Sequence, residues 1–171
     1  MRLGVIADTH GRLVAEVGAL FSRVDHILHA GDIGSAELLE RLGTLAPVTA
    51  VYGNVDPYEV RARCPKVARV ELDGFIVVVT HGDQFGSPAP DVLTREFPDA
   101  EIIVFGHTHR PLLQLVDKTV TVMNPGSAGA PRFGLQPSVG IMELEPGIPP
   151  RARLVRLGNG ASAGGPLPNP S

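Results

Sequence analysis

The sequence predicts an α/β fold in which two sheets pack face to face, with helices on the outside. In the first two thirds of the chain, short apolar runs bounded by turn residues alternate with stretches of helical periodicity. After Gly106, predicted strands follow one another without an intervening helix. Alternation followed by a run of strands is typical of two packed sheets with flanking helices.

Five apolar runs, rich in Val and Ile, predict buried strands. Their bounds are Leu3–Ala7, Ile27–Ala30, Val48–Tyr52, Phe75–Thr80 and Ile102–Phe105.

Three helices are expected between these strands. Residues 13–24 place apolar side chains at i, i+4, i+7, i+8 and i+11, which predicts an amphipathic helix. A second apolar stripe runs over Leu38–Leu45, and Ser35 is its expected N-cap. A third, short helix is expected from about Asp91 to Phe97, where Pro98 ends it.

The second part of the chain predicts two pairs of strands. Leu112–Val116 and Thr119–Met123 flank Asp117-Lys118, a weak turn signal, and are expected to form a hairpin. Val139–Leu144 and Ala152–Leu157 flank a turn rich in Pro and Gly.

The length of 171 residues predicts one domain, which we place at residues 1–157. Residues 158–171 contain four Gly, three Pro and no charge, and are expected to form a flexible tail.

Composition argues against several classes of protein. The net charge of −3, with two Tyr, six Phe and no Trp, does not suit a dedicated nucleic-acid-binding module. The single cysteine, Cys64, forbids an intramolecular disulfide and a thiolate-cluster metal site. The apolar run at the N-terminus is too short for a signal peptide, and no stretch approaches the roughly 20 apolar residues that span a bilayer. We therefore expect a cytoplasmic protein without membrane contact.

Residues of the types that bind metals come directly after each of the five predicted strands. These segments are Asp8-Thr9-His10, Gly31-Asp32, Gly53-Asn54, His81-Gly82 and Gly106-His107-Thr108-His109. In open α/β sheets, ligands bind at the carboxyl ends of strands. An i, i+2 spacing in extended chain also puts both members of a His or Asp/His pair on one face. Each fragment alone is a weak signal, whereas five of them in these positions predict a metal centre.

The set of segments resembles the calcineurin-like metallophosphoesterases, in particular their small bacterial and archaeal phosphodiesterase branch. Asn124-Pro125-Gly126-Ser127 is also similar to that branch, and the resemblance covers about residues 1–157. It implies a four-layer α-β-β-α sandwich of two mixed sheets, with two metal ions at the sheet ends. The eukaryotic retromer subunit, which is similar to this branch, shares the fold and acts mainly as a scaffold.

The resemblance also implies a ligand set, in which Asp32 bridges the two ions. The first ion would be held by Asp8, His10, Asp32 and His109. The second ion would be held by Asp32, Asn54, His81 and His107. The expected catalytic residues are Asp32, Asn54 and His81. Mixed N/O ligation suits divalent Mn, Fe, Co, Ni or Zn, with Mn favoured, and four imidazoles argue against Ca or Mg.

The charge of such a site suits an anionic substrate. Two divalent ions and two carboxylates leave a charge of +2, which a bridging hydroxide lowers to +1. Paired metals can hold a hydroxide nucleophile and stabilise an in-line displacement at phosphorus. We therefore expect hydrolysis of a small phosphate ester, more specifically a diester.

One position departs from the family pattern. Many branches have His directly after the metal-binding Asn as a candidate general acid, and the small phosphodiesterase branch often has Cys. Here the residue is Val55, which cannot donate a proton.

Substrate contacts are expected from Arg12 and Arg110, from Asn124 and Gly126, and from the loop Gly82–Asp91. A hydrogen-bonded structural role is expected for His29, and no nucleophilic role for Cys64.

Two alternative functions stay open. One is a scaffold that binds metal with little turnover, for which Val55 is the main support; the other is a phosphomonoesterase on the same metal pair. The expected partners are a small phosphate-ester substrate and, from the resemblance alone, a second copy of the chain in a homodimer.

Overall fold

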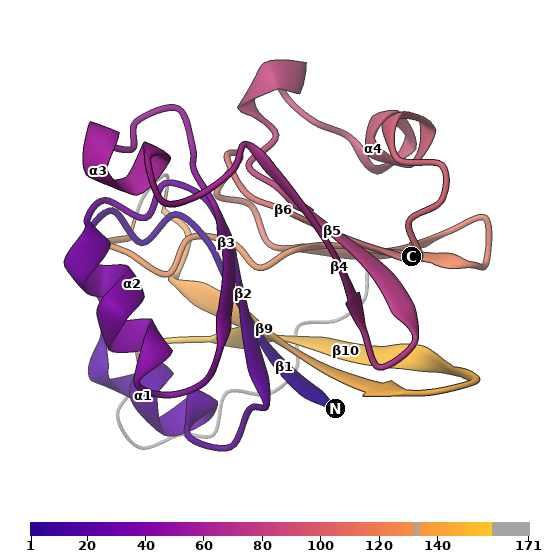
Figure 1. Ribbon diagram of the computed structural model, residues 1–171, viewed down its shortest axis with the longest axis horizontal. Helices are drawn as coiled ribbons and strands as arrows, with labels where there is room; N and C mark the ends of the chain where they lie inside the picture. Colours follow the sequence, from indigo (N-terminus) through magenta and orange to yellow (C-terminus); the bar gives the residue numbers. More distant parts are fainter. Residues whose placement is uncertain (132–133, 159–171) are drawn as a thin grey trace.

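The computed structural model describes residues 1–131 and 134–158, and the predicted tail lies outside the described residues from position 159 onward. The described strands form two five-stranded sheets (Figure 1). The first sheet has the order β10-β9-β1-β2-β3, with bounds Ile148–Arg156, Ser138–Glu145, Arg2–Ile6, His26–Ala30 and Val48–Val51. The second sheet has the order β4-β5-β6-β8-β7, with bounds Val67–Leu72, Phe75–Thr80, Ile102–Phe105, Val120–Asn124 and Leu112–Val116.

Helices cover the outer faces of the two sheets (Figure 1). Their bounds are α1, Ala15–Phe21; α2, Ala36–Gly43; α3, Tyr58–Arg61; and α4, Pro90–Glu96. A buried cluster that includes Val17 and Leu38 joins α1 and α2 to the first sheet, and another that includes Leu93 joins α4 to the second. The expected four-layer sandwich is therefore confirmed.

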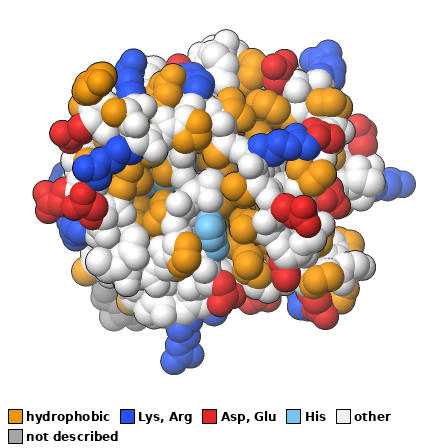
Figure 2. Space-filling model, in the orientation of Figure 1, with side chains coloured by type: hydrophobic (Ala, Val, Ile, Leu, Met, Phe, Trp, Pro, Cys, Tyr) orange, Lys and Arg blue, Asp and Glu red, His pale blue; other side chains and the backbone are white. Residues whose placement is uncertain are grey.

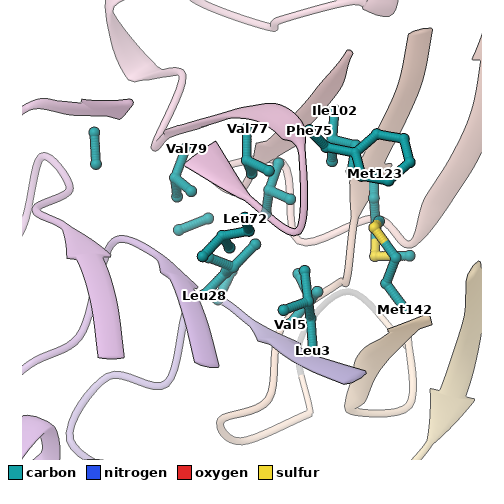
Figure 3. Close-up of a cluster of buried hydrophobic side chains, with 14 of the residues drawn as sticks. Leu3, Val5, Leu28, Leu72, Phe75, Val77, Val79, Ile102, Met123 and Met142 are labelled. Carbon is teal, nitrogen blue, oxygen red and sulfur yellow. The ribbon is translucent and has the colours of Figure 1, made fainter. Parts of the chain in front are cut away.

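The central core lies between the two sheets (Figure 3). Leu3, Leu28 and Met142 come from the first sheet, and they pack against side chains such as Val79 and Met123 from the second. All five are fully buried. Burial of apolar surface on both faces of each sheet explains why the sequence shows continuous Val- and Ile-rich runs here.

Parallel pairing gives each sheet a common carboxyl end. β1, β2 and β3 run parallel in the first sheet, and β5, β6 and β8 run parallel in the second. The loops that follow these strands therefore leave each sheet at one edge. The predicted ligands follow β1, β2, β3, β5 and β6.

All the strands expected from the sequence are present, and the differences have local causes. β4 was not predicted, because it alternates apolar residues with Arg69 and Glu71 instead of forming an apolar run. Its partner is β5 alone, so it is an edge strand with one solvated face. In β10, Pro149 and Pro150 are tolerated because this strand also lies at an edge.

The helices agree with the sequence in position and differ in length. Ser35 caps α2 as expected, since its Oγ accepts a hydrogen bond from the N–H of Leu38 at 3.3 Å. α1 is shorter than the predicted 13–24 because Val14 is extended (φ −75°, ψ 149°), although Leu13 and Val14 still pack on the core. The short helices α3 and η1 (Asp83–Phe85) were not predicted.

The face shown in Figure 2 carries Lys and Arg side chains interspersed with Asp and Glu, and no continuous basic area gathers on it. The helices found in residues 1–131 and 134–158 are all too short and polar to span a bilayer.

We expect Leu28→Ala to lower the free energy of unfolding by about 2–5 kcal/mol, because it opens a cavity between the sheets. Chemical denaturation measures the change. Leu115→Ala is the matched control, because Leu115 is 56% exposed and its loss should change the stability by less than about 0.5 kcal/mol. Equal losses in the two variants would contradict the assignment of the core.

Candidate metal centre

The seven predicted ligands lie in the loops at the carboxyl ends of five strands. Asp8 and His10 follow β1, Asp32 follows β2 and Asn54 follows β3. The second sheet contributes the residues after β5 and β6, which are His81, His107 and His109. The two sheets thus supply the candidate ligands from opposite sides.

Four of these residues form a compact group. Ligand atoms of Asp8, His10, Asp32 and His109 all lie within 4.8 Å of one another. These are the residues that the family resemblance implies for the first ion. His109 Nε2 lies 3.1 Å from Asp8 Oδ1, which joins the two sheets across the group.

The remaining residues surround His81. Its Nε2 atom lies 3.4 Å from Asp32 Oδ2 and 3.2 Å from Asn54 Oδ1. The His81 and His107 rings meet edge to face, with centroids 5.2 Å apart. The structure therefore also brings together the set assigned to the second ion, and Asp32 adjoins both groups.

The backbone of the candidate ligands is strained. Non-glycine residues rarely have positive φ angles. Five of the seven candidate ligands do, namely Asp8 (52°), His10 (48°), Asp32 (52°), His107 (68°) and His109 (57°). Such conformations persist where the surrounding structure imposes them, and they cluster at functional sites.

Glycines permit the close approach of these loops. A Cβ on Gly106 would lie 2.7 Å from the carbonyl oxygen of Ala30 and 3.0 Å from Asp8 Oδ2. A Cβ on Gly53 would overlap Asp32 Oδ1. Neither overlap can be relieved by moving a flexible side-chain end, so larger residues would push the loops apart.

The buried polar atoms fit a metal ion. Asp8 is fully buried, and neither of its carboxylate oxygens has a hydrogen bond within the described part of the chain, although Oδ1 lies 3.1 Å from His109 Nε2. A buried carboxylate with so few partners is costly unless a cation compensates it. The set of carboxylate, imidazole and amide groups also suits a divalent transition metal.

The orientation of the His81 ring also suits a metal ligand. Its Nδ1 donates to the carbonyl oxygen of Ala30 at 2.8 Å, and a carbonyl can only accept. Nδ1 therefore carries a proton, and Nε2 is the ring nitrogen that faces Asp32 and Asn54. A hydrogen bond from the far ring nitrogen is how ligating histidines are commonly fixed.

Charges and hydrogen bonds among the candidate ligands shift the pKa values of Asp32 and His81. Burial alone would raise the pKa of Asp32, but the hydrogen bond and charge of His81 and the N–H of Val55 outweigh burial and lower it. Burial alone would lower the pKa of His81, but Asp32, Asp8 and the Ala30 carbonyl outweigh burial and raise it. In the protein without metal, the two groups thus favour an ion pair that a cation would replace.

The side chain of Asn124 makes three hydrogen bonds within the protein. Its Nδ2 donates to the carbonyl oxygen of Gly106 at 2.9 Å and to Thr108 Oγ1 at 3.0 Å. Its Oδ1 accepts from the N–H of Gly126 at 2.9 Å. Asn124 is fully buried and both of its amide protons are used. The geometry therefore makes it a support for the loop that carries His107 and His109, and a contact of Asn124 or Gly126 with substrate stays a prediction.

Other expected substrate contacts lie at the surface. The side chains of Arg12 and Arg110 are exposed beside His10 and His109, so a contact with substrate stays a prediction. Val55 is 58% exposed, and only its backbone N–H contacts the centre, at 3.1 Å from Asp32 Oδ1. Cys64 is buried, and burial raises the pKa of its thiol, which does not favour a nucleophile.

A buried pair behind the centre, Thr9 and His29, explains the shape of the first loop. Thr9 Oγ1 donates to the carbonyl oxygen of Ile33 at 3.0 Å and lies 2.9 Å from His29 Nε2. Because a hydroxyl has one proton, His29 Nε2 must donate to Thr9. The structural role expected for His29 is therefore seen, whereas nothing in the sequence singled out Thr9.

The carboxyl ends of strands from both sheets meet at a group of carboxylate, imidazole and amide side chains. This arrangement defines an α/β protein with a candidate metal centre at its strand ends. Residues 1–147 match the calcineurin-like phosphoesterase superfamily domain. The chain therefore belongs to the calcineurin-like phosphoesterases.

Individual relatives agree with this assignment. A probable metallophosphoesterase of Methanothermobacter thermautotrophicus is 34% identical over 167 residues, which cover 92% of this chain and 94% of the relative. Vacuolar protein sorting 29 of Cryptosporidium parvum has a similar fold, with a TM-score of 0.83, 22% identity and coverage of 97% and 96% of the two chains. A Streptococcus pneumoniae protein described as a predicted phosphoesterase has a TM-score of 0.69, 26% identity and coverage of 91% and 88%.

Burial of His29 predicts a dependence of stability on pH. Burial, with a smaller effect from the charge of His81, lowers the pKa of His29 to about 3. Below pH 6.5 the unfolded chain binds a proton at this residue and the folded protein does not, so acid removes stability. We expect the wild type to lose about 1 to 2 kcal/mol relative to His29→Gln between pH 6.5 and 5.

The measurement is the free energy of unfolding of both proteins in the presence of a chelator. Gln keeps a donor near the position of Nε2 and does not titrate, so the difference between the two curves isolates His29. Parallel curves over this pH range would show that His29 is not buried in its neutral form.

Proposed function

We propose that the protein is a dinuclear metal-dependent phosphodiesterase, with Asp8, His10, Asp32 and His109 holding one ion and Asp32, Asn54, His81 and His107 holding the other. The observation that supports it most is the position of Asp32. This residue belongs to the compact four-residue group and also lies 3.4 Å from His81, which adjoins Asn54. Manganese is the proposed metal among the divalent transition ions, and a small phosphate ester in the cytoplasm is the proposed substrate.

Two ions bound there would activate a hydroxide nucleophile and neutralise charge on the phosphoryl oxygens. The chain's own contribution is to hold the ligands in place. Asp32 offers both carboxylate oxygens between the two groups, and Asn54 offers an amide oxygen that adds no negative charge. Arg12 and Arg110 are exposed and follow the ligands His10 and His109 closely in the sequence, and in this proposal they contact a phosphate anion.

A second candidate is a metal-binding scaffold with little turnover, and Val55 is the observation that favours it. Its exposed side chain cannot donate a proton to a leaving group. A phosphomonoesterase on the same metal pair is the third possibility. A homodimer also stays a proposal.

Metal reconstitution with paired substrates separates these functions. The protein, freed of metal and then loaded with Mn²⁺, should bind two ions per chain and hydrolyse bis(nitrophenyl) phosphate faster than nitrophenyl phosphate. Chelation should abolish the activity. Asp32→Asn should lower kcat/KM for the diester by more than about 100-fold, because it removes a charge between two cations.

The surface variant Asp99→Asn is the control for Asp32→Asn, because Asp99 is exposed and its carboxylate pairs with Arg69 of β4. Faster hydrolysis of the monoester would favour the phosphomonoesterase. Two bound ions with no turnover of either ester would favour the scaffold.

The residue after Asn54 predicts a strong dependence of rate on the leaving group. Without a proton donor at Val55, diesters with nitrophenol leaving groups should react fast, and those with alcohol leaving groups should react slowly. Val55→His should raise kcat for poor leaving groups by up to about 100-fold, the low end of general acid catalysis, and change good ones by less than about threefold. The ring has room, because Val55 is 58% exposed.

Rates for a series of diesters that differ only in leaving-group pKa provide the test. Val55→Gln is the matched control, since it is similar in polarity to His but is not an acid. A flat dependence in the wild type, with chemistry rate-limiting, would mean that another group donates the proton.

A further inference from the structure

A buried carboxylate outside the ligand set joins the loops of the centre. Asp56 is 3% exposed. It accepts hydrogen bonds from the N–H of Gly34 at 2.7 Å and from the N–H of Gly53 at 2.8 Å, one on each oxygen. Gly34 lies two residues after Asp32, and Gly53 directly precedes Asn54. One side chain thus spans the loop after β2 and the loop after β3.

The Gly34 segment in turn supports the loop after β1. Gly34 has a φ of 95°, and a Cβ there would overlap the backbone of His10 and Gly11. The same loops exchange backbone hydrogen bonds, from the N–H of His10 to Asp32 at 2.9 Å and from the N–H of Gly11 to Ile33 at 2.7 Å. The loop after β1 is therefore held to the loop after β2 by backbone hydrogen bonds that do not involve Asp56.

Arg61 holds the Asn54 loop from α3. Its Nε donates to the carbonyl oxygen of Asp56 and its Nη2 to the carbonyl oxygen of Asn54, both at 2.7 Å. The guanidinium also lies over the ring of Tyr52, 5.5 Å from its centroid. Asn54 itself is exposed and its side chain contacts His81, so these backbone contacts are what hold its loop against the protein.

We propose that Asp56 is a positioning residue, which sets the spacing of Asn54 from Asp32 and thereby the affinity for the second ion. Among the described residues, the donors to the Asp56 carboxylate are the N–H groups of Gly34 and Gly53 and not candidate ligand atoms, so it acts through the backbone of the two loops. The inference rests on the proposed pair of ions. Arg61 also positions Asn54, because it donates hydrogen bonds to the carbonyl groups of residues 54 and 56.

The two ions should respond differently to the loss of Asp56, because different contacts hold the loops that carry their ligands. Asn54 belongs only to the second group, and both Asp56 and Arg61 hold its loop. Asp8 and His109, in the first group, are held by other contacts, such as the hydrogen bond from the N–H of Asp8 to Gly31 at 3.0 Å. Loss of Asp56 should therefore weaken the second ion more than the first.

Asp56→Asn tests the proposal. The amide offers one oxygen, so its NH₂ group would face one of the two backbone N–H groups and leave that donor unsatisfied. We expect the dissociation constant of the second ion to rise by about 10- to 100-fold, the usual effect of losing a group that orients a metal ligand, while that of the first ion changes less than about threefold. The measurement is calorimetric titration of the metal-free protein with Co²⁺ alone.

Two further variants make the test specific. Arg61→Gln changes an exposed side chain, should fold like the wild type, and should also weaken the second ion selectively. Glu59→Gln is the matched control, because Glu59 lies in the same segment and contacts only the N–H of Ala36, at 3.4 Å. It should leave both dissociation constants unchanged.

Unfolding in the presence of a chelator is measured in parallel. A lower stability of Asp56→Asn with an unchanged ratio of the two dissociation constants would mean a purely structural role and would overturn the proposal. Selective loss of the second ion in Asp56→Asn, together with a wild type that hydrolyses no phosphate ester, would support the role of Asp56 and reject the proposed function. Binding of one ion by the wild type would reject both.

Discussion

The hydrogen bond from His81 Nδ1 to the carbonyl oxygen of Ala30 is the contact on which the arrangement of the centre depends. It runs from the end of the second sheet to the end of the first, so it brings the two sheets together where the candidate ligands lie. It also turns Nε2 toward Asp32 and Asn54. The approach leaves no room for a side chain on either flank, since a Cβ on Gly31 or Gly106 would lie 2.7 Å from His81 or Ala30.

The close approach of the two sheet ends explains why the loops that carry the candidate ligands have strained backbones. A residue in the left-handed region costs of order 1–3 kcal/mol. Asp8 and Asp32 both have φ angles of 52°, so the fold must compensate at each strand end. Thr9 with His29 and the carboxylate of Asp56 provide buried hydrogen bonds just behind these residues. The strain is thus supported by groups that have no expected contact with metal or substrate.

The sequence predicts the strands and the candidate ligands because both depend on local patterns. An apolar run that ends in Gly-Asp or Asp-Thr-His indicates both a buried strand and what lies at its carboxyl end. The same pattern does not reveal β4, whose alternation of apolar and charged residues suits an edge strand. Nor does it reveal the hydrogen bonds that the Asn124 amide donates to Gly106 and Thr108. The sequence does not predict the hydrogen bonds of Asp56 for another reason. Asp before Pro is typical of a turn, and its two donors, Gly34 and Gly53, lie 22 and 3 positions away. Only the assembled loops show that one carboxylate reaches both.

At position 55 the backbone and the side chain have separate roles. The N–H of Val55 donates to Asp32 Oδ1, which any residue except Pro could do, so the candidate metal centre does not depend on the side chain. The side chain is 58% exposed beside Asn54, where it could meet only a ligand or solvent. A change of this side chain can therefore leave the backbone contact with Asp32 intact. For this reason the proposed metal binding and the proposed role of position 55 in proton donation each need their own measurement.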